Sequence, residues 1–293
     1  MAYVLLISAV MMWSFVGVLV KYASMMVDSS TITVCRFLFG VIFLGFLIKF
    51  NKQAFNFNWK NKWIWIGAIG KCINYIFENI AIAIGFAYGN IINLPIQTVF
   101  LAVVSVCYFG EKINFLKISS ILLCLAGVVL VSGKGSFFAL VSSNITTVLF
   151  AISAIGAGIH IISQKKLIGQ MDSANMNFST FFLCTVITGA PVPYTFHTTG
   201  DFSVIALFSL IVLGLITGIS FYINSKVLEK LPLLTIAITT NFSVVFSLLW
   251  AWIFFNEPID EYVISGAITF IFGIVLLSIP EKENLSVSSS DNC

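Results

Sequence analysis

The chain has 293 residues, of which 59% are hydrophobic and 9% charged, whereas a typical soluble domain carries about 25% charged residues. Apolar runs of roughly 17 to 25 residues, the length that crosses a bilayer, recur from one end of the sequence to the other. These features exclude a water-soluble domain and predict an all-α integral membrane protein. The net charge of +3 comes from dispersed lysines, so we expect no nucleic-acid partner.

Hydropathy predicts about ten transmembrane helices. In chain order they cover residues 3–24, 33–50, 63–86, 90–109, 115–132, 145–164, 176–195, 204–225, 235–255 and 261–279. The first run has no basic segment before it and no clear cleavage site after it, so we expect it to be retained as the first helix. Residues 281–293 are expected to form a polar cytoplasmic tail.

Basic residues gather on one side of this topology. If the N-terminus is cytoplasmic, the even-numbered connections and the tail hold eleven of the fifteen basic residues. They are Lys49, Lys52, Lys60, Lys62, Lys112, Lys117, Lys165, Lys166, Lys226, Lys230 and Lys282. Because cytoplasmic loops are enriched in Lys and Arg, we expect a multi-pass protein of the cell membrane with both termini in the cytoplasm.

A spaced pattern recurs in the two halves of the chain. Phe109, Glu111, Ile113, Gly127, Leu130 and Ser132 are matched 146 positions later by Phe255, Glu257, Ile259, Gly273, Leu276 and Ser278. An offset of five helices inverts the second half in the membrane, and inverted repeats form a binding site at their interface near the midplane. We therefore predict a five-plus-five inverted repeat around a central cavity, with units at residues 1–133 and 134–280.

With these motifs the sequence resembles the drug/metabolite transporter superfamily, in its EamA-like branch of two five-helix repeats. The resemblance rests on Trp13-Ser14, Lys21, Arg36-Phe37, Leu94-Pro95, Phe109-Gly110-Glu111-Lys112-Ile113, Gly127-Val128-Val129-Leu130, Phe255-Asn256-Glu257-Pro258-Ile259 and Gly273-Ile274-Val275-Leu276. The second half departs from the pattern at Asn241, which replaces a proline, and at Gly158, which stands where the first half has Trp13. The resemblance implies a transporter, with substrates that range over amino acids, quaternary amines, nucleotide-linked sugars, sugars and drugs.

Two predicted helices carry polar residues on one face. In the helix at 63–86 these residues, spaced i, i+3, i+4 and i+7, are Lys71, Asn74, Tyr75 and Glu78. The equivalent positions of the helix at 204–225 are Thr217, Ser220, Phe221 and Asn224. Since a charged side chain at a helix centre in lipid costs at least ~2.5 kcal/mol, both stripes predict a wet cavity that binds a small-molecule substrate. The structural alternative is that Lys71 and Glu78 pair with neighbouring helices and only fix packing.

Further candidate lining residues lie on other helices. Asn93 and Gln97 flank Pro95, which frees a backbone carbonyl, although a simple kink is the alternative. Trp13 offers an aromatic face to a cation. His160 is the one intramembrane histidine, and it either relays a proton or stays neutral with one hydrogen bond.

Charged residues near the helix ends receive structural roles. We expect Glu111 and Glu257 to cap backbone N–H groups at the start of the following helix. Lys21 and Arg36 are expected to reach toward the outer surface, to pair with outer acidic residues or to form an outer gate.

These residues predict a secondary-active transporter that moves a small polar or amphipathic metabolite by alternating access, with a proton as candidate coupling ion. The first hypothesis is an amino acid or related zwitterion or amine, with Lys71 facing a carboxylate and Glu78 an ammonium group. The alternatives are an exporter of hydrophobic organic cations or drugs, and a channel-like facilitator. We expect no enzyme, metal or cofactor, since dispersed cysteines and one intramembrane histidine supply no catalytic set. The lipid bilayer is the expected surrounding, and the sequence leaves a monomer or a dimer open.

Overall fold

The computed structural model of the chain describes residues 2–110, 114–133 and 145–278. Its first half contains helices α1 (Ala2–Ser14), α2 (Val16–Ser24), α3 (Ser29–Phe50), α4 (Lys62–Ile84), the 3-10 helix η1 (Ala87–Ile92), α5 (Asn93–Phe109) and α6 (Phe115–Gly133). Its second half contains α8 (Ile145–Leu167), α9 (Ser173–Gly189), α10 (Val192–Thr195), α11 (Val204–Leu228), α12 (Leu233–Thr240), α13 (Ser243–Phe255) and α14 (Glu261–Ser278).

Each range predicted from hydropathy coincides with one helix or with two consecutive ones. Within the described residues, 6 helical stretches are long and apolar enough to cross a membrane, and α6 and α14 are shorter apolar helices. The structure therefore agrees with a multi-pass, all-α membrane protein. The crossing of the membrane by about ten helices stays a prediction.

Two helix boundaries differ from the prediction for local reasons. Helix α3 begins at Ser29 instead of residue 33, because the Asp28 carboxylate accepts hydrogen bonds from the N–H groups of Ser30 and Thr31 at 2.9 and 3.0 Å. Burial alone would raise the pKa of Asp28, but hydrogen bonds from Thr31, His197 and Ser30 together hold this pKa below its usual value. Helix α9 ends at Gly189, since Pro191 cannot donate the next helical hydrogen bond.

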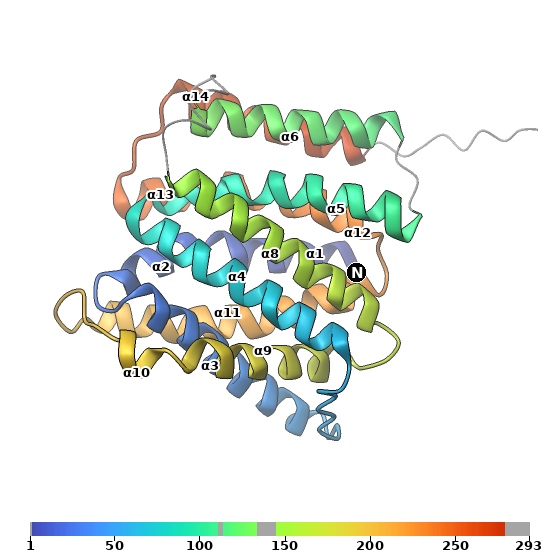
Figure 1. The fold of residues 1–293 in the computed structure, drawn as a ribbon. Helices are drawn as coiled ribbons and strands as arrows, with labels where there is room; N and C mark the ends of the chain where they lie inside the picture. Colours follow the sequence, from blue (N-terminus) through green and yellow to red (C-terminus); the bar gives the residue numbers. More distant parts are fainter. Residues whose placement is uncertain (1, 111–113, 134–144, 279–293) are drawn as a thin grey trace, which may run out of the picture.

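Helices of the two halves pack in pairs that follow the repeat. Contacts of α3 with α9, α5 with α12 and α6 with α14 join equivalent helices. The first predicted helix of each half also packs against the third predicted helix of the other half. These contacts join α1 with α11 and α8 with α4. Figure 1 shows α6 lying along α14 at one side of the bundle. This pattern is the one expected of two repeats related by a pseudo-two-fold axis.

The first turns of α3 and α9 each receive a segment from the opposite half. At α3, the N–H of His197 donates to Asp28 at 3.4 Å and the N–H of Thr199 donates to the Met26 carbonyl at 3.1 Å. At α9, the N–H of Asn56 donates to Asn175 Oδ1 at 2.9 Å. We call residues 195–200 and 54–56 the two straps. They lie at opposite ends of α3, which we call the α2–α3 end and the α3–α4 end (Figure 1).

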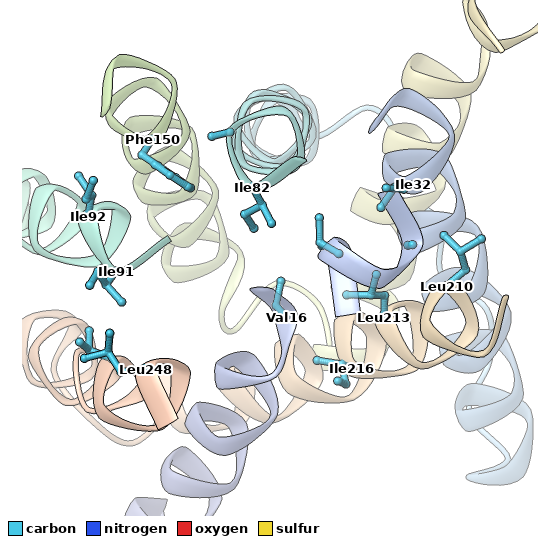
Figure 2. Close-up of a cluster of buried hydrophobic side chains, with 14 of the residues drawn as sticks. Val16, Ile32, Ile82, Ile91, Ile92, Phe150, Leu210, Leu213, Ile216 and Leu248 are labelled. Atoms are coloured by element: carbon cyan, nitrogen blue, oxygen red, sulfur yellow. The ribbon is translucent and has the colours of Figure 1, made fainter. Parts of the chain in front are cut away.

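The interior of the bundle is apolar at both ends. One cluster joins residues near the α2–α3 end, including Val20, Ile32, Ile82 and Leu210, and Figure 2 shows such side chains from both halves turning toward the same region. Another cluster, at the α3–α4 end, includes Leu6, Val10, Val227, Leu228 and Leu233. Buried polar residues such as Ser14 and Ser220 lie between these two clusters along their helices.

The topology is testable by cysteine labelling in intact cells. If both termini are cytoplasmic, an impermeant thiol reagent should reach cysteines placed at 136–143, which lie outside the described residues, and a cysteine at exposed Thr198. Cysteines placed at 52–60 should react only after permeabilisation. The unaltered chain, in which Cys107 is exposed, gives the background. The opposite labelling pattern would contradict the predicted orientation.

Candidate functional site

A cavity lies in the middle of the bundle and is lined from both halves of the chain. Its lining residues are Trp13, Val16, Arg36, Lys71, Asn74, Tyr75, Glu78, Asn93, Leu94, Gln97, Ala157, Ile161, Phe221, Thr240 and Ser243. About 80 Å³ of it is accessible to the centre of a water molecule, and one water needs only about 10–15 Å³ by this measure. The space therefore suits a small ligand or several waters.

The order of residues along each helix places the cavity between the two apolar clusters. Along α1 and α2, Val10 belongs to the cluster at the α3–α4 end, Trp13 lines the cavity and Val20 belongs to the other cluster. Along α11 the same order appears in reverse, with Leu213 before Phe221 and Val227 after it. Along these helices the cavity therefore lies between the two apolar clusters.

Close helix packing brings α4 against α8 beside the cavity. A Cβ atom on Gly156 would lie 2.6 Å from the carbonyl oxygen of Gly70, so this approach needs glycine. The glycines of α8 therefore let the neighbouring helix approach closely. The approach brings Ser153 of α8 to Asn74 of α4, whose Nδ2 donates to Ser153 Oγ at 2.8 Å.

Lys71 is buried in the cavity wall. Its Nζ donates to Asn74 Oδ1 at 2.7 Å and lies 4.0 and 3.9 Å from the ring centroids of Tyr75 and Phe221. Aromatic faces attract the ammonium group in this arrangement. Among the described residues no carboxylate lies within ion-pair distance of Lys71. Its direct contacts are therefore with an amide oxygen and two aromatic rings.

Glu78 forms a buried ion pair with Arg36 of α3. Arg36 Nη1 donates to Glu78 Oε2 at 3.0 Å and to Asn79 Oδ1 at 2.7 Å, and the guanidinium carbon lies 3.5 Å from the Tyr75 ring centroid. The expectation that Arg36 reaches the surface is wrong, since the residue is 2% exposed. Its guanidinium stays in the interior because Glu78 supplies the counter-charge and Asn79 a further acceptor.

The polar network continues into α5. Asn93 Nδ2 donates to Ser153 Oγ at 3.0 Å, so Lys71, Asn74, Ser153 and Asn93 form one chain of hydrogen bonds. Gln97 lines the cavity one turn further along α5, and none of the described residues accepts or donates a hydrogen bond with its side chain. Its amide is thus available to a ligand.

Three predicted site residues lie away from the cavity lining. His160 is fully buried between the rings of Phe181 and Phe221, and its Nδ1 lies 3.2 Å from the Gly67 carbonyl. A carbonyl only accepts, so Nδ1 carries the proton in this contact. Ser220 donates to the Ile216 carbonyl of its own helix, and Asn224 donates to Gln164 at 3.4 Å.

The broken helices of the two halves meet next to the cavity. The range expected as one helix at 3–24 is interrupted at Phe15, and the range at 235–255 is interrupted at Asn241 and Phe242. Ser14 accepts from Trp250 Nε1 at 3.0 Å and, through its carbonyl, from Ser247 at 3.2 Å. Side chains from one half thus bind backbone and hydroxyl groups next to the break in the other.

Two charged residues act at helix ends in ways that differ from the prediction. Lys21 binds the carbonyls of Ile82 and Gly85 at the end of α4, and no described carboxylate pairs with it. Such carbonyls carry partial negative charge, so a lysine suits them. Glu257 accepts from the N–H of Ala87 at 2.8 Å and so caps η1 of the first half instead of the helix that follows it. Glu111 lies outside the described residues.

Comparisons with known proteins agree with this architecture. The model of the EamA-like transporter family matches residues 1–133 and 144–279. A solved structure described only as the crystal structure of a protein has a TM-score of 0.76 to this chain at 13% identity, over 94% of this chain and 96% of its own, which concerns the fold alone. No curated protein matches the sequence. Since the family model covers most of its residues, the chain belongs to the EamA-like transporter family of membrane transporters.

Proposed function

We propose that the protein is a secondary-active transporter that binds a small polar metabolite in the central cavity and moves it by alternating access. The observation that carries this proposal is a central cavity lined by helices of both halves, with the buried side chains of Lys71, Arg36 and Glu78 in its wall. Ionisable residues within a membrane mark substrate or ion pathways. A protein built only for assembly has no need of such a cavity.

An amino acid or a related zwitterion is the first substrate class to test. Lys71 offers N–H donors to a carboxylate, and Glu78 Oε1 with Gln97 offers oxygen acceptors to an ammonium group. A hydrophobic organic cation is the second candidate, favoured by the aromatic rings of the wall. Those rings, however, already face the side chains of Arg36 and Lys71.

Transport in proteoliposomes tests the proposed function directly. A carrier should show uptake that saturates with substrate concentration and counterflow, in which unlabelled substrate on one side drives accumulation of labelled substrate. A metabolite that raises the thermal stability of the purified protein identifies the compound to use. Flux that rises without saturation and without counterflow would point to the channel-like alternative instead.

Alternating access also predicts that the strap at the α2–α3 end must open. Val27 and Thr198 face each other in an antiparallel bridge, a spacing that a disulfide can span. Oxidation of the Val27→Cys/Thr198→Cys double variant should stop uptake, and reduction should restore it. Each single cysteine variant serves as the control. Undiminished uptake with the disulfide formed would show that this strap stays closed during transport.

A further inference from the structure

We propose that the cavity selects its substrate by a carboxylate group and requires no ammonium group, so that small organic anions bind and the matching amines do not. This inference rests on the proposed function and narrows the substrate class of the same cavity. It follows from the balance of charge in the wall and from the hydrogen-bonding groups that have no partner.

The wall carries more positive than negative charge. Two cationic side chains, Lys71 and Arg36, and one carboxylate, Glu78, line the cavity. Arg36 lies 3.0 Å from Glu78, so this pair is neutral as a unit, and Lys71 remains without an acidic partner among the described residues. The charge of Glu78 is therefore balanced by Arg36 through Oε2, whereas no carboxylate lies within ion-pair distance of Lys71 in the described residues.

Several hydrogen-bond donors on the cavity-lining residues have no acceptor in the described part of the protein. Lys71 uses one of its three N–H groups, on Asn74. The indole Nε1 of Trp13 and the Nε of Arg36 are hydrogen-bond donors on cavity-lining residues. Both are buried, and neither has a partner in the described residues. A buried donor left unpaired is costly, and a carboxylate with two oxygens accepts from several donors at once.

The apolar part of the wall indicates what accompanies the carboxylate. Val16, Leu94, Ile161 and Phe221 line the same cavity as the charged groups. The Oδ1 atom of Asn93, buried and unpaired within the described residues, offers one acceptor to a hydroxyl or amino group. A carboxylate on a compact apolar skeleton fits this lining, and an amino group is an optional addition.

Matched ligands on the unaltered protein test the inference. Each set keeps one skeleton and changes the charged groups: alanine, propionate and ethylamine; leucine, 4-methylpentanoate and 3-methylbutylamine; phenylalanine, 3-phenylpropionate and 2-phenylethylamine. Thermal stabilisation is measured for each compound over the same concentration range. We expect stabilisation by carboxylates of at least one set and none by its amine. Stabilisation by the matching amine, by the amino acids but not by the simple carboxylates, or by no carboxylate in any set, would overturn the inference.

A lysine variant tests which residue provides the selection. Because charge-assisted hydrogen bonds are strong, Lys71→Met should weaken carboxylate binding roughly ten- to a hundredfold, and Lys71→Arg should retain most of it. Lys60→Met, at an exposed position of the 51–61 segment, is the matched control and should bind like the unaltered chain. Unchanged carboxylate binding by folded Lys71→Met would overturn the role of Lys71.

The two proposals fail in different ways. Carboxylate binding without saturable uptake or counterflow would overturn the transporter proposal and leave the selectivity standing. Saturable uptake of amines that Lys71→Met leaves unchanged would overturn the selectivity and leave the transporter standing.

Discussion

Replacing Arg36 by methionine is expected to destabilise the protein by roughly 3–5 kcal/mol of unfolding free energy and to abolish transport. The change leaves the Glu78 carboxylate in the interior without its counter-charge at 3.0 Å, and it removes the donor that Asn79 Oδ1 receives at 2.7 Å. Thermal unfolding in detergent measures the loss of stability, and uptake in proteoliposomes measures the loss of transport.

The double variant Arg36→Met/Glu78→Met separates the cost of an unpaired buried charge from the cost of changed packing. With both charges removed, much of the lost stability should return, since a buried pair replaced by apolar groups of similar volume is often neutral. Lys226→Met provides the matched control, because Lys226 and Glu229 form an exposed pair at 3.6 Å whose loss should cost about 1 kcal/mol at most. Equal effects of the Arg36 and Lys226 variants would contradict the importance of the buried pair.

The polar stripe of α4 could be predicted from the sequence because helical periodicity is a local property. Residues spaced i, i+3, i+4 and i+7 share a face in any α-helix, and Lys71, Asn74, Tyr75 and Glu78 do line one cavity. The partner of Glu78 could not be predicted in this way. Arg36 lies on another helix, 42 positions away, and only the packing of α3 on α4 brings them together.

The internal repeat predicted which helix positions of the second half correspond to the polar stripe of α4, but it did not predict the contacts of each side chain there. At the positions equivalent to the α4 stripe, Phe221 lines the cavity, whereas Ser220 bonds to its own backbone and Asn224 to Gln164. Hydroxyl and amide groups take whichever partner is closest, and that depends on neighbours the repeat does not fix. Glu257 illustrates the same limit, because its partner Ala87 belongs to the other half of the chain.

The Glu78→Gln variant is expected to abolish uphill, proton-driven transport while exchange of substrate continues. Glu78 lies in the cavity wall, where one oxygen binds Arg36, and a carboxylate that gains and loses a proton there can link proton movement to opening of the cavity. The glutamine amide oxygen can still accept from Arg36 Nη1, so the variant keeps the geometry and fixes one neutral state.

Accumulation driven by an imposed pH gradient and counterflow without a gradient measure these two activities on the same proteoliposomes. Glu78→Asp keeps a titratable carboxylate on the same helix position and should retain part of the uphill transport. If Glu78 serves only as a counter-charge, the glutamine variant should instead bind substrate differently at every pH, with exchange and uphill transport changed together. Full uphill transport with unchanged apparent affinity would contradict both roles, and Glu78 would then serve only to hold Arg36, and with it α3, against α4.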